Sequence, residues 1–157
     1  MRENYRPKGK IDVLFIGESP PPPKGNLIRY FYNEQENEPR RLYRKIAYAL
    51  NLNDKLKPQG LQDFKNRKMW FTDIFDEPWK EVKTETIGAH FNRLFQEIKD
   101  AGPNKIIALL PKRKINEVFM YFFKRQIPNE VKLLHINPWR ENKEQFKKKL
   151  LEFLNNC

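Results

Sequence analysis

Four short runs of apolar residues divide this chain, and polar residues, glycines or prolines bound each run. They cover residues 13–16, 69–74, 105–110 and 131–136. The first run shows no alternation between apolar and polar positions. Continuous apolar runs of this length are typical of strands covered on both faces, as in a parallel sheet. The pattern therefore predicts four buried strands with helices above and below them.

Between the strands, apolar residues recur at helical spacing and predict four amphipathic helices. The expected inward faces are, in chain order, Leu42, Ile46, Ala49 and Leu50; Ile87, Phe91, Leu94, Phe95 and Ile98; Ile115, Val118, Phe119, Phe122 and Phe123; and Phe146, Leu150, Leu151 and Leu154. Gly102 followed by Pro103 marks the end of the second helix. Residues 51–68 read as a polar, partly irregular connection.

Strands that alternate with helices are typical of a parallel sheet sandwiched between helical layers. The predicted fold is therefore α/β, a three-layer α/β/α sandwich around a mostly parallel, four-stranded sheet. A length of 157 residues fits a single domain, and no linker or internal repeat divides the chain.

The composition is strongly basic. Lys and Arg number 31 against 20 Asp and Glu, a formal net charge of +11 at pH 7. Residues 101–157 alone hold 12 Lys and Arg against 5 Glu. Such a surplus favours an anionic partner, nucleic acid first and an anionic membrane second. A basic proteome produces the same bias without any ligand, so charge alone leaves DNA binding open.

The cysteine and histidine content bears on cofactors and location. The one cysteine, Cys157, allows no disulfide framework and no thiolate cluster for zinc or iron–sulfur. His90 and His135 are too few for a usual metal cluster, so we expect no cofactor. Residues 1–10 form a polar, basic lead-in without the apolar core of a signal peptide, and no run is long enough to span a bilayer. We expect a cytoplasmic monomer without membrane association.

Polar residues lie at the ends of three predicted strands. Gly17 and Glu18 follow the first, Asp73 lies near the end of the second, and His135 and Asn137 end the fourth. Four consecutive prolines then hold the chain after the first strand extended. Because the carboxyl ends of parallel strands share one edge, we expect these groups to converge. The simpler alternative is that Glu18 is an ordinary loop carboxylate.

These segments resemble, in their order, the motifs of the uracil-DNA glycosylase superfamily. Residues 17–20, Gly-Glu-Ser-Pro, resemble its first motif, a glycine and an acidic or polar residue ahead of a proline. The aromatic residues 30–32 fall where that family places the ring that stacks on the flipped base. Residues 71–74 resemble the base-reading strand, and residues 135–140 resemble the closing motif and its inserting loop.

The resemblance implies a monofunctional hydrolase that breaks the N-glycosidic bond of a flipped, damaged or deaminated DNA base. Glu18 would then position the attacking water and stabilise positive charge on the sugar. His135 or Asn137 would donate a hydrogen bond to the departing base, and which of the two does so stays open. A histidine at a strand end is more often structural.

The same resemblance implies base and DNA contacts. Gly17, Ser19 and Asp73 would contact the base, and Phe31 or Tyr32 would stack on it, unless these rings simply pack in the core. Trp139 would act as a wedge and Arg140 as a phosphate contact, although Trp139 is equally suited to plug the core. Further DNA contacts are expected at Lys24, Lys112 and Arg113.

Two departures from the family pattern limit the comparison. Ser19 stands where several branches carry Asp or Asn, so only Glu18 is left as the acid, and the branch with glutamate there usually holds an iron–sulfur cluster that this chain cannot bind. Asp73 stands where uracil readers generally use asparagine. An ionised aspartate only accepts hydrogen bonds and would repel uracil O4, which favours an amino-bearing or purine base or a protonated Asp73.

Two other readings stay open. One is a non-catalytic protein of the same fold that binds nucleic acid or a nucleobase, which the missing second acid favours. The other is an unrelated α/β enzyme or nucleotide-binding protein. The chain lacks the glycine-rich phosphate-binding fingerprints of the common nucleotide folds, and neither Ser19 nor Cys157 has an evident His and Asp arrangement for nucleophilic hydrolysis.

Overall fold

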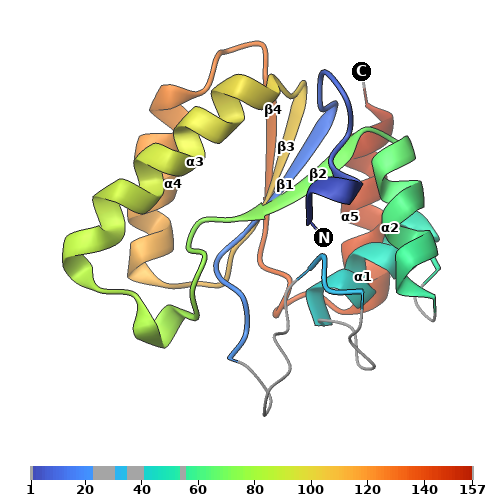
Figure 1. The fold of residues 1–157 in the computed structure, drawn as a ribbon, viewed down its shortest axis with the longest axis horizontal. Coiled ribbons are helices and arrows are strands. Elements are labelled where there is room, and N and C mark those ends of the chain that lie inside the picture. The colour runs from blue at the N-terminus through green and yellow to red at the C-terminus, as the bar shows by residue number, and fades with distance from the viewer. Residues whose placement is uncertain (1, 23–30, 35–40, 54–55, 157) are drawn as a thin grey trace.

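The computed structural model describes residues 2–22, 31–34, 41–53 and 56–156. Its centre is one sheet of four strands in the order β2-β1-β3-β4 (Figure 1). All neighbouring pairs are parallel, and the strands are β1 (Val13–Gly17), β2 (Met69–Asp73), β3 (Lys105–Leu109) and β4 (Lys132–Ile136). The four predicted strands are confirmed.

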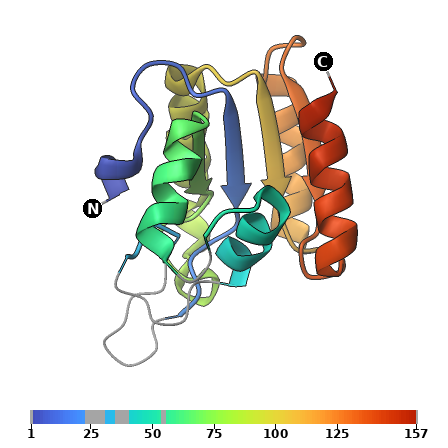
Figure 2. The same cartoon turned by 90° about the vertical axis from the view of Figure 1, so that its right-hand side faces the viewer.

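Helices cover both faces of the sheet, which gives three layers (Figures 1 and 2). One face carries α3 (Ile87–Ala101) and α4 (Lys114–Gln126). The other carries α1 (Arg41–Leu50), α2 (Lys57–Asn66) and α5 (Lys143–Asn155). The 3-10 helices are η1 (Arg2–Tyr5), η2 (Trp79–Glu81) and η3 (Thr84–Thr86). The predicted α/β/α sandwich is confirmed, and no helix of the described part is long and apolar enough to cross a membrane.

The strands end at one level. Gly17 is the register partner of both Asp73 and Leu109, and Leu109 is the partner of Ile136. Backbone pairing continues one step further, because Phe75 donates to the carbonyl of Glu18 at 2.9 Å. Figure 2 shows β1 and β3 pointing toward the same end of the molecule. We call this edge of the sheet the carboxyl rim; the predicted placement of the polar strand ends on one edge is confirmed.

Helices α1 and α3 follow their apolar periodicity. The four residues predicted to face inward from α1 are all buried. In α3, Phe91, Leu94 and Ile98 are buried, and the helix ends at Gly102 in the left-handed conformation, with φ 60°. The Gly102 N–H donates to the carbonyl of Ile98 at 3.0 Å. A glycine adopts this conformation without a steric penalty, which explains why the sequence marks this boundary so clearly.

The connection predicted between residues 51 and 68 instead contains the helix α2. It begins at Lys57, with Pro58 in its first turn, and buries Leu61 and Phe64. Gly60 lies so close to the Tyr43 hydroxyl that a Cβ there would be 2.1 Å from it. Two apolar side chains are too few to produce a periodic signal, so the packing of α2 against the sheet stabilises a helix that the local sequence barely indicates.

Helix α4 presents the predicted face only in part, because Phe119 and Phe123 are buried and two other predicted residues are not. Val118 and Phe122 are 38% and 47% exposed, whereas Asn116 and Met120 are 2% and 6% exposed. Phe119 is buried as expected. The inward face thus includes, in its first turn, an asparagine that hydrophobicity alone places outside. The reason is a polar contact at the carboxyl rim, described next.

Candidate functional site

Glu18 lies directly after β1 on the carboxyl rim, and its side chain is only 8% exposed. Arg113 Nε lies 3.0 Å from its Oε2 and 3.2 Å from its Oε1. The side-chain amide of Asn116 donates to Oε2 at 2.6 Å. A buried carboxylate needs such partners because desolvation otherwise disfavours its charge. Glu18 is therefore held in one orientation and is not an ordinary loop carboxylate.

Asn116 was not singled out by sequence reasoning, although it shares the carboxylate with Arg113. Its Nδ2 also donates to the carbonyl of Pro111 at 3.0 Å. Since Glu18 and the Pro111 carbonyl only accept, the amide nitrogen must face them, which fixes the amide orientation. Among the described residues its buried Oδ1 has no hydrogen-bond partner. The sequence offered one indication of its burial, its helical spacing from Phe119 and Phe123. That indication was too weak to single out a polar residue.

Arg113 was predicted to contact DNA, and the structure pairs its guanidinium with Glu18. It immediately precedes α4, and its guanidinium also lies 5.5 Å from the ring centre of Trp79. Its side chain remains 45% exposed. An exposed flank next to the ion pair leaves room for a second anion, so the predicted DNA contact and the ion pair are compatible.

Gly17 allows β2 to approach β1 closely. A Cβ at this position would lie 2.5 Å from Asp73 Oδ1 and 2.7 Å from Phe71 Cζ. The Asp73 carboxylate therefore lies over the backbone of Gly17 on the carboxyl rim. The structure brings these two predicted base-binding residues together. Ser19 follows and is half-buried, whereas Lys24 lies outside the described residues.

The rings of Phe31 and Tyr32 are core residues, 1% and 2% exposed. Phe31 stacks on Phe71, with ring centres 4.3 Å apart and an angle of 11°. Tyr32 stacks on Trp70, and its hydroxyl accepts a 2.8 Å hydrogen bond from the Phe71 N–H. Burial raises the pKa of the Tyr32 hydroxyl well above its usual value, against smaller opposing effects. The alternative of core packing is the one that the structure shows, and a role in base stacking stays a prediction.

Asp73 and these two rings line a cavity of about 220 Å³ at the β2 end of the rim. Arg93 from α3 borders it and donates to the carbonyls of Asp73 and Ile74 at 3.0 and 2.8 Å. Arg2 also borders this cavity. The cavity is thus built jointly by the end of β2, helix α3 and the amino-terminal segment.

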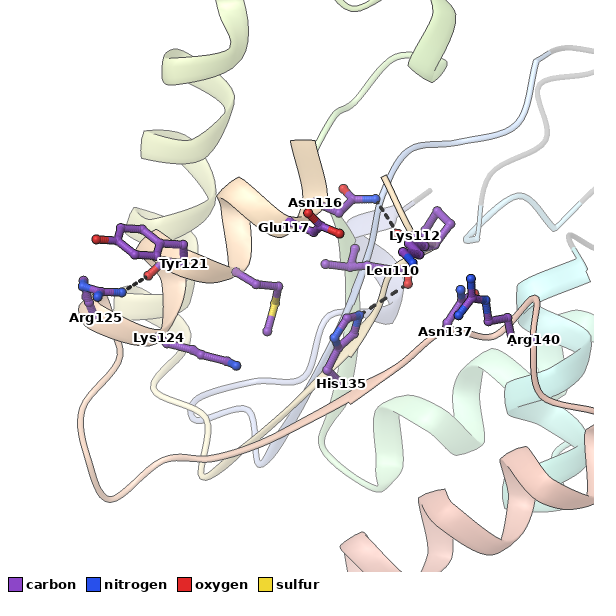
Figure 3. A pocket seen from close by; sticks show the side chains of 12 residues that line it. Leu110, Lys112, Asn116, Glu117, Tyr121, Lys124, Arg125, His135, Asn137 and Arg140 are labelled. Atoms are coloured by element: carbon purple, nitrogen blue, oxygen red, sulfur yellow. Dashed lines mark hydrogen bonds between the residues drawn. The ribbon is translucent and has the colours of Figure 1, made fainter. Parts of the chain in front are cut away.

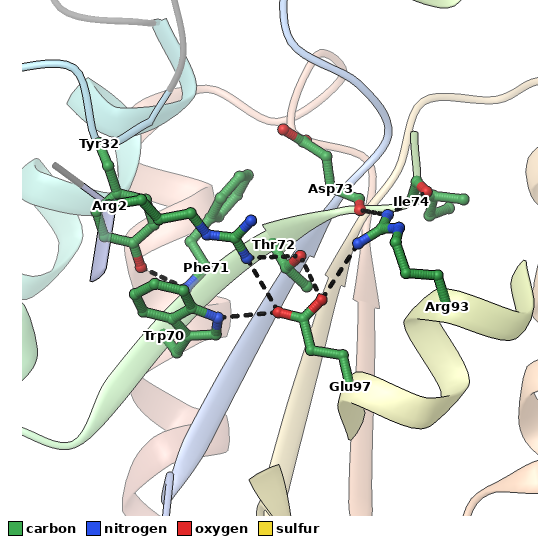
Figure 4. Close-up of polar contacts among 9 residues, drawn as sticks. All are labelled: Arg2, Tyr32, Trp70, Phe71, Thr72, Asp73, Ile74, Arg93 and Glu97. Atoms are coloured by element: carbon green, nitrogen blue, oxygen red, sulfur yellow. Dashed lines mark hydrogen bonds and ion pairs between the residues drawn. The ribbon is translucent and has the colours of Figure 1, made fainter. Parts of the chain in front are cut away.

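Glu97 connects the residues beside this cavity by accepting several hydrogen bonds (Figure 4). Its carboxylate accepts from Arg2 at 3.0 Å, from the Trp70 indole at 3.1 Å and from Arg93 at 3.3 Å. The Thr72 hydroxyl donates to it at 3.2 Å. The first ten residues, expected to be a polar, basic lead-in to β1, contain the 3-10 helix η1, which buries Tyr5.

His135 and Asn137 line a second cavity, of about 470 Å³, between β4 and α4 (Figure 3). The His135 side chain is exposed at the sheet edge, and its Nε2 lies 3.4 Å from the carbonyl of Leu110. Asn137 Oδ1 accepts from the backbone N–H of Trp139 at 3.1 Å and thereby shapes the following turn. Lys112 and Arg140, both predicted to contact DNA, line the same cavity.

Trp139 is 47% exposed, so it does not plug the core. The Arg41 guanidinium lies 5.7 Å from its ring centre. Lys45 of α1 anchors the surrounding loop by donating to the carbonyls of Pro138 and Glu141. Burial, together with the nearby Arg41 charge, lowers the pKa of this lysine. An exposed ring on an anchored loop suits the predicted role of a wedge.

The polar strand ends thus share one rim but spread across the sheet, so the predicted convergence of these groups on one site is wrong. With about 4.8 Å between neighbouring strands, β2 and β4 lie about 14 Å apart. Asp73 lines one cavity and His135 and Asn137 line the other, while Glu18 directly follows β1, between these strands, and lines neither cavity. Among the described residues, no three His, Cys, Asp or Glu side chains gather closely enough to hold a metal ion.

Compared with models of known protein families, the chain matches none. A search of curated proteins finds no significant match in sequence either. The resemblance to uracil-DNA glycosylases therefore stays a prediction, and the functional argument depends on the geometry of this chain's own residues.

Proposed function

We propose that this protein is a DNA base-excision hydrolase in which Glu18 positions the water that attacks the sugar. The observation that carries the proposal is the buried Glu18 carboxylate on the carboxyl rim, oriented by Arg113 and Asn116. Oε2 has two donors and Oε1 has one among the described residues. Because a carboxylate oxygen has two acceptor sites, Oε1 retains one for a water.

The proposed reaction is a hydrolysis. The oxygen of the water forms a bond to C1′ of the deoxyribose, and its proton passes through Glu18 to solvent. The departing base takes the electron pair of the N-glycosidic bond and then a proton, so that the products are an abasic site and a free base. Glu18 also stabilises the positive charge that develops on the sugar. A base must leave the duplex stack to reach this buried carboxylate.

Asp73 is the proposed reader of the base, because its carboxylate lies over Gly17 on the carboxyl rim and lines the cavity at the β2 end. An ionised aspartate accepts and does not donate, so the favoured substrates are amino-bearing or purine bases and not uracil, whose O4 it would repel. The rim charges Lys112 and Arg140 would hold the phosphates on either side of the flipped nucleotide.

A panel of single-turnover assays tests this proposal. Oligonucleotides that carry uracil, hypoxanthine, xanthine or a cytosine-derived lesion are scanned for abasic product with the wild-type protein and with Glu18→Gln. The variant keeps an oxygen that can accept from Asn116 and loses the charge. We expect release of at least one base and a decrease of about 10²- to 10⁴-fold in Glu18→Gln. A clear preference for uracil that Asp73→Asn leaves unchanged contradicts the proposed reading of the base.

A non-catalytic nucleobase- or DNA-binding protein is the second candidate. The observation that favours it is that Glu18 already connects β1 to the start of α4 through Arg113 and Asn116, which is a structural role in itself. Equal DNA affinity of the wild type and Glu18→Gln, with no base released by either, would decide for the binder.

A further inference from the structure

We propose that the cavity between α4 and β4 binds a single strand of nucleic acid, which runs from the carboxyl rim along α4 and stacks a base on Tyr121. This goes beyond the reaction at Glu18 and rests on the proposed function only in taking DNA as the partner. The cavity measures about 470 Å³ and opens beside His135 and Asn137 (Figure 3).

The charge of the lining is the first argument. Four cationic side chains line the cavity against a single carboxylate, that of Glu117: they are Lys112, Lys124, Arg125 and Arg140. All four are exposed to solvent. A concave surface with this excess of positive charge attracts a polyanion and concentrates its potential where the backbone phosphates would lie.

The second argument is an aromatic platform at the far end of the same cavity. Tyr121 is 55% exposed, and Phe122 beside it is 47% exposed. The Arg125 guanidinium lies 3.7 Å from the centre of the Tyr121 ring, and it donates to the Tyr121 carbonyl at 2.9 Å. Exposed rings and guanidinium planes of this kind are the surfaces on which proteins stack the unpaired bases of single strands.

The length of the path is the third argument. From Asn116 at the rim to Arg125 the helix advances nine residues, about 14 Å at 1.5 Å per residue. Lys124 and Arg125 lie at one end of this path and Lys112 and Arg140 at the other (Figure 3). Charges at both ends and a ring near one of them fit a short stretch of extended strand better than a single small anion.

Binding of a fluorescent oligothymidine, measured by anisotropy at several salt concentrations, tests the inference without any base release. We expect Tyr121→Ala to weaken binding about 5- to 100-fold and Tyr121→Phe, which keeps the ring, to bind like the wild type. Lys124→Ala should reduce the slope of log K against log salt by about 0.7. The matched control is Lys148→Ala, an exposed lysine of α5 on the other face of the sheet, which should change neither quantity.

Three results would overturn the inference. The first is that Tyr121→Ala and Lys124→Ala bind the oligonucleotide like the wild type. The others are that Lys148→Ala loses as much affinity as Lys124→Ala, or that an acidic peptide competes as well as an unlabelled oligonucleotide. The three positions are exposed, and thermal unfolding verifies that each of the four variants is folded. Position-specific loss of binding without base release removes only the glycosylase proposal. Base release with unchanged binding in the α4 variants removes only this inference.

Discussion

The side-chain amide of Asn116 donates a 2.6 Å hydrogen bond to Glu18, although 98 positions separate the two residues in the sequence. This bond joins the end of β1 to the first turn of α4 and places one polar side chain of that helix on its buried side. It also orients the one carboxylate to which we assign the chemistry. The fold of α4 and the geometry of the candidate site therefore depend on the same contact.

Replacing Asn116 by leucine should lower the free energy of unfolding by about 1–3 kcal/mol, because Glu18 Oε2 loses a donor in a buried site. Urea unfolding at neutral pH measures the change. Asn92→Leu is the matched control, since Asn92 is exposed on α3 and its substitution should stay within about 0.5 kcal/mol. Equal effects of the two variants would show that the contact with Glu18 contributes nothing specific.

Gly17→Ala should destabilise the protein by about 1–3 kcal/mol, because the new Cβ would lie 2.7 Å from the Phe71 ring, which is itself stacked on Phe31. Gly88→Ala is the comparison: nothing lies within 4 Å of its added Cβ near the start of α3, so a gain of about 0.4–1 kcal/mol is expected there. Thermal or urea unfolding of both variants shows whether the free energy of unfolding falls in Gly17→Ala and rises in Gly88→Ala. A neutral Gly17→Ala would show that β2 can shift without cost.

Tyr32→Phe should lower stability at pH 7 by about 1–3 kcal/mol, because the Phe71 N–H loses its acceptor. It should also flatten the fall of stability in alkali. Burial raises the Tyr32 pKa in the folded protein well above 10, so the neutral hydroxyl stabilises the fold fully below the unfolded pKa of about 10 and loses this contribution as pH rises beyond it.

Urea unfolding of wild type and Tyr32→Phe between pH 8 and about 11 measures this difference. Removal from water and Glu34 raise the pKa of Tyr5 to about 12, and this residue contributes to both proteins alike, so the difference between them isolates Tyr32. Parallel curves over the whole range would contradict the assignment.

Glu97→Ala should cost about 1–3 kcal/mol, because the Trp70 indole and Arg93 lose a shared acceptor that is only 14% exposed. Asp63→Ala breaks the ion pair with Arg67, whose two side chains are 43% and 37% exposed, and should cost at most about 1 kcal/mol. Unfolding in low and high salt compares the two. The Asp63 effect should shrink with salt, whereas most of the Glu97 effect should persist.

Some features of the candidate site could be read from the chain before folding. The sequence predicted a common rim for Glu18, Asp73 and His135, which lie at the ends of apolar runs. Such a run indicates a buried strand from adjacent residues alone. What could not be read is how far apart these groups lie on that rim. The strand order β2-β1-β3-β4 separates Asp73 from His135 by two intervening strands, and no local pattern encodes that order.

Local sequence determined the four strands, the end of α3 at Gly102 and the α/β class, since apolar periodicity and a helix-ending glycine act over a few residues. Tertiary structure alone decided that Phe31 and Tyr32 are buried, that Asn116 faces inward, that α2 forms, and that Arg2 reaches Glu97. Each of these depends on a partner many positions away. Such contacts exist only once the sheet has brought distant segments together. No short stretch of the chain can therefore predict them.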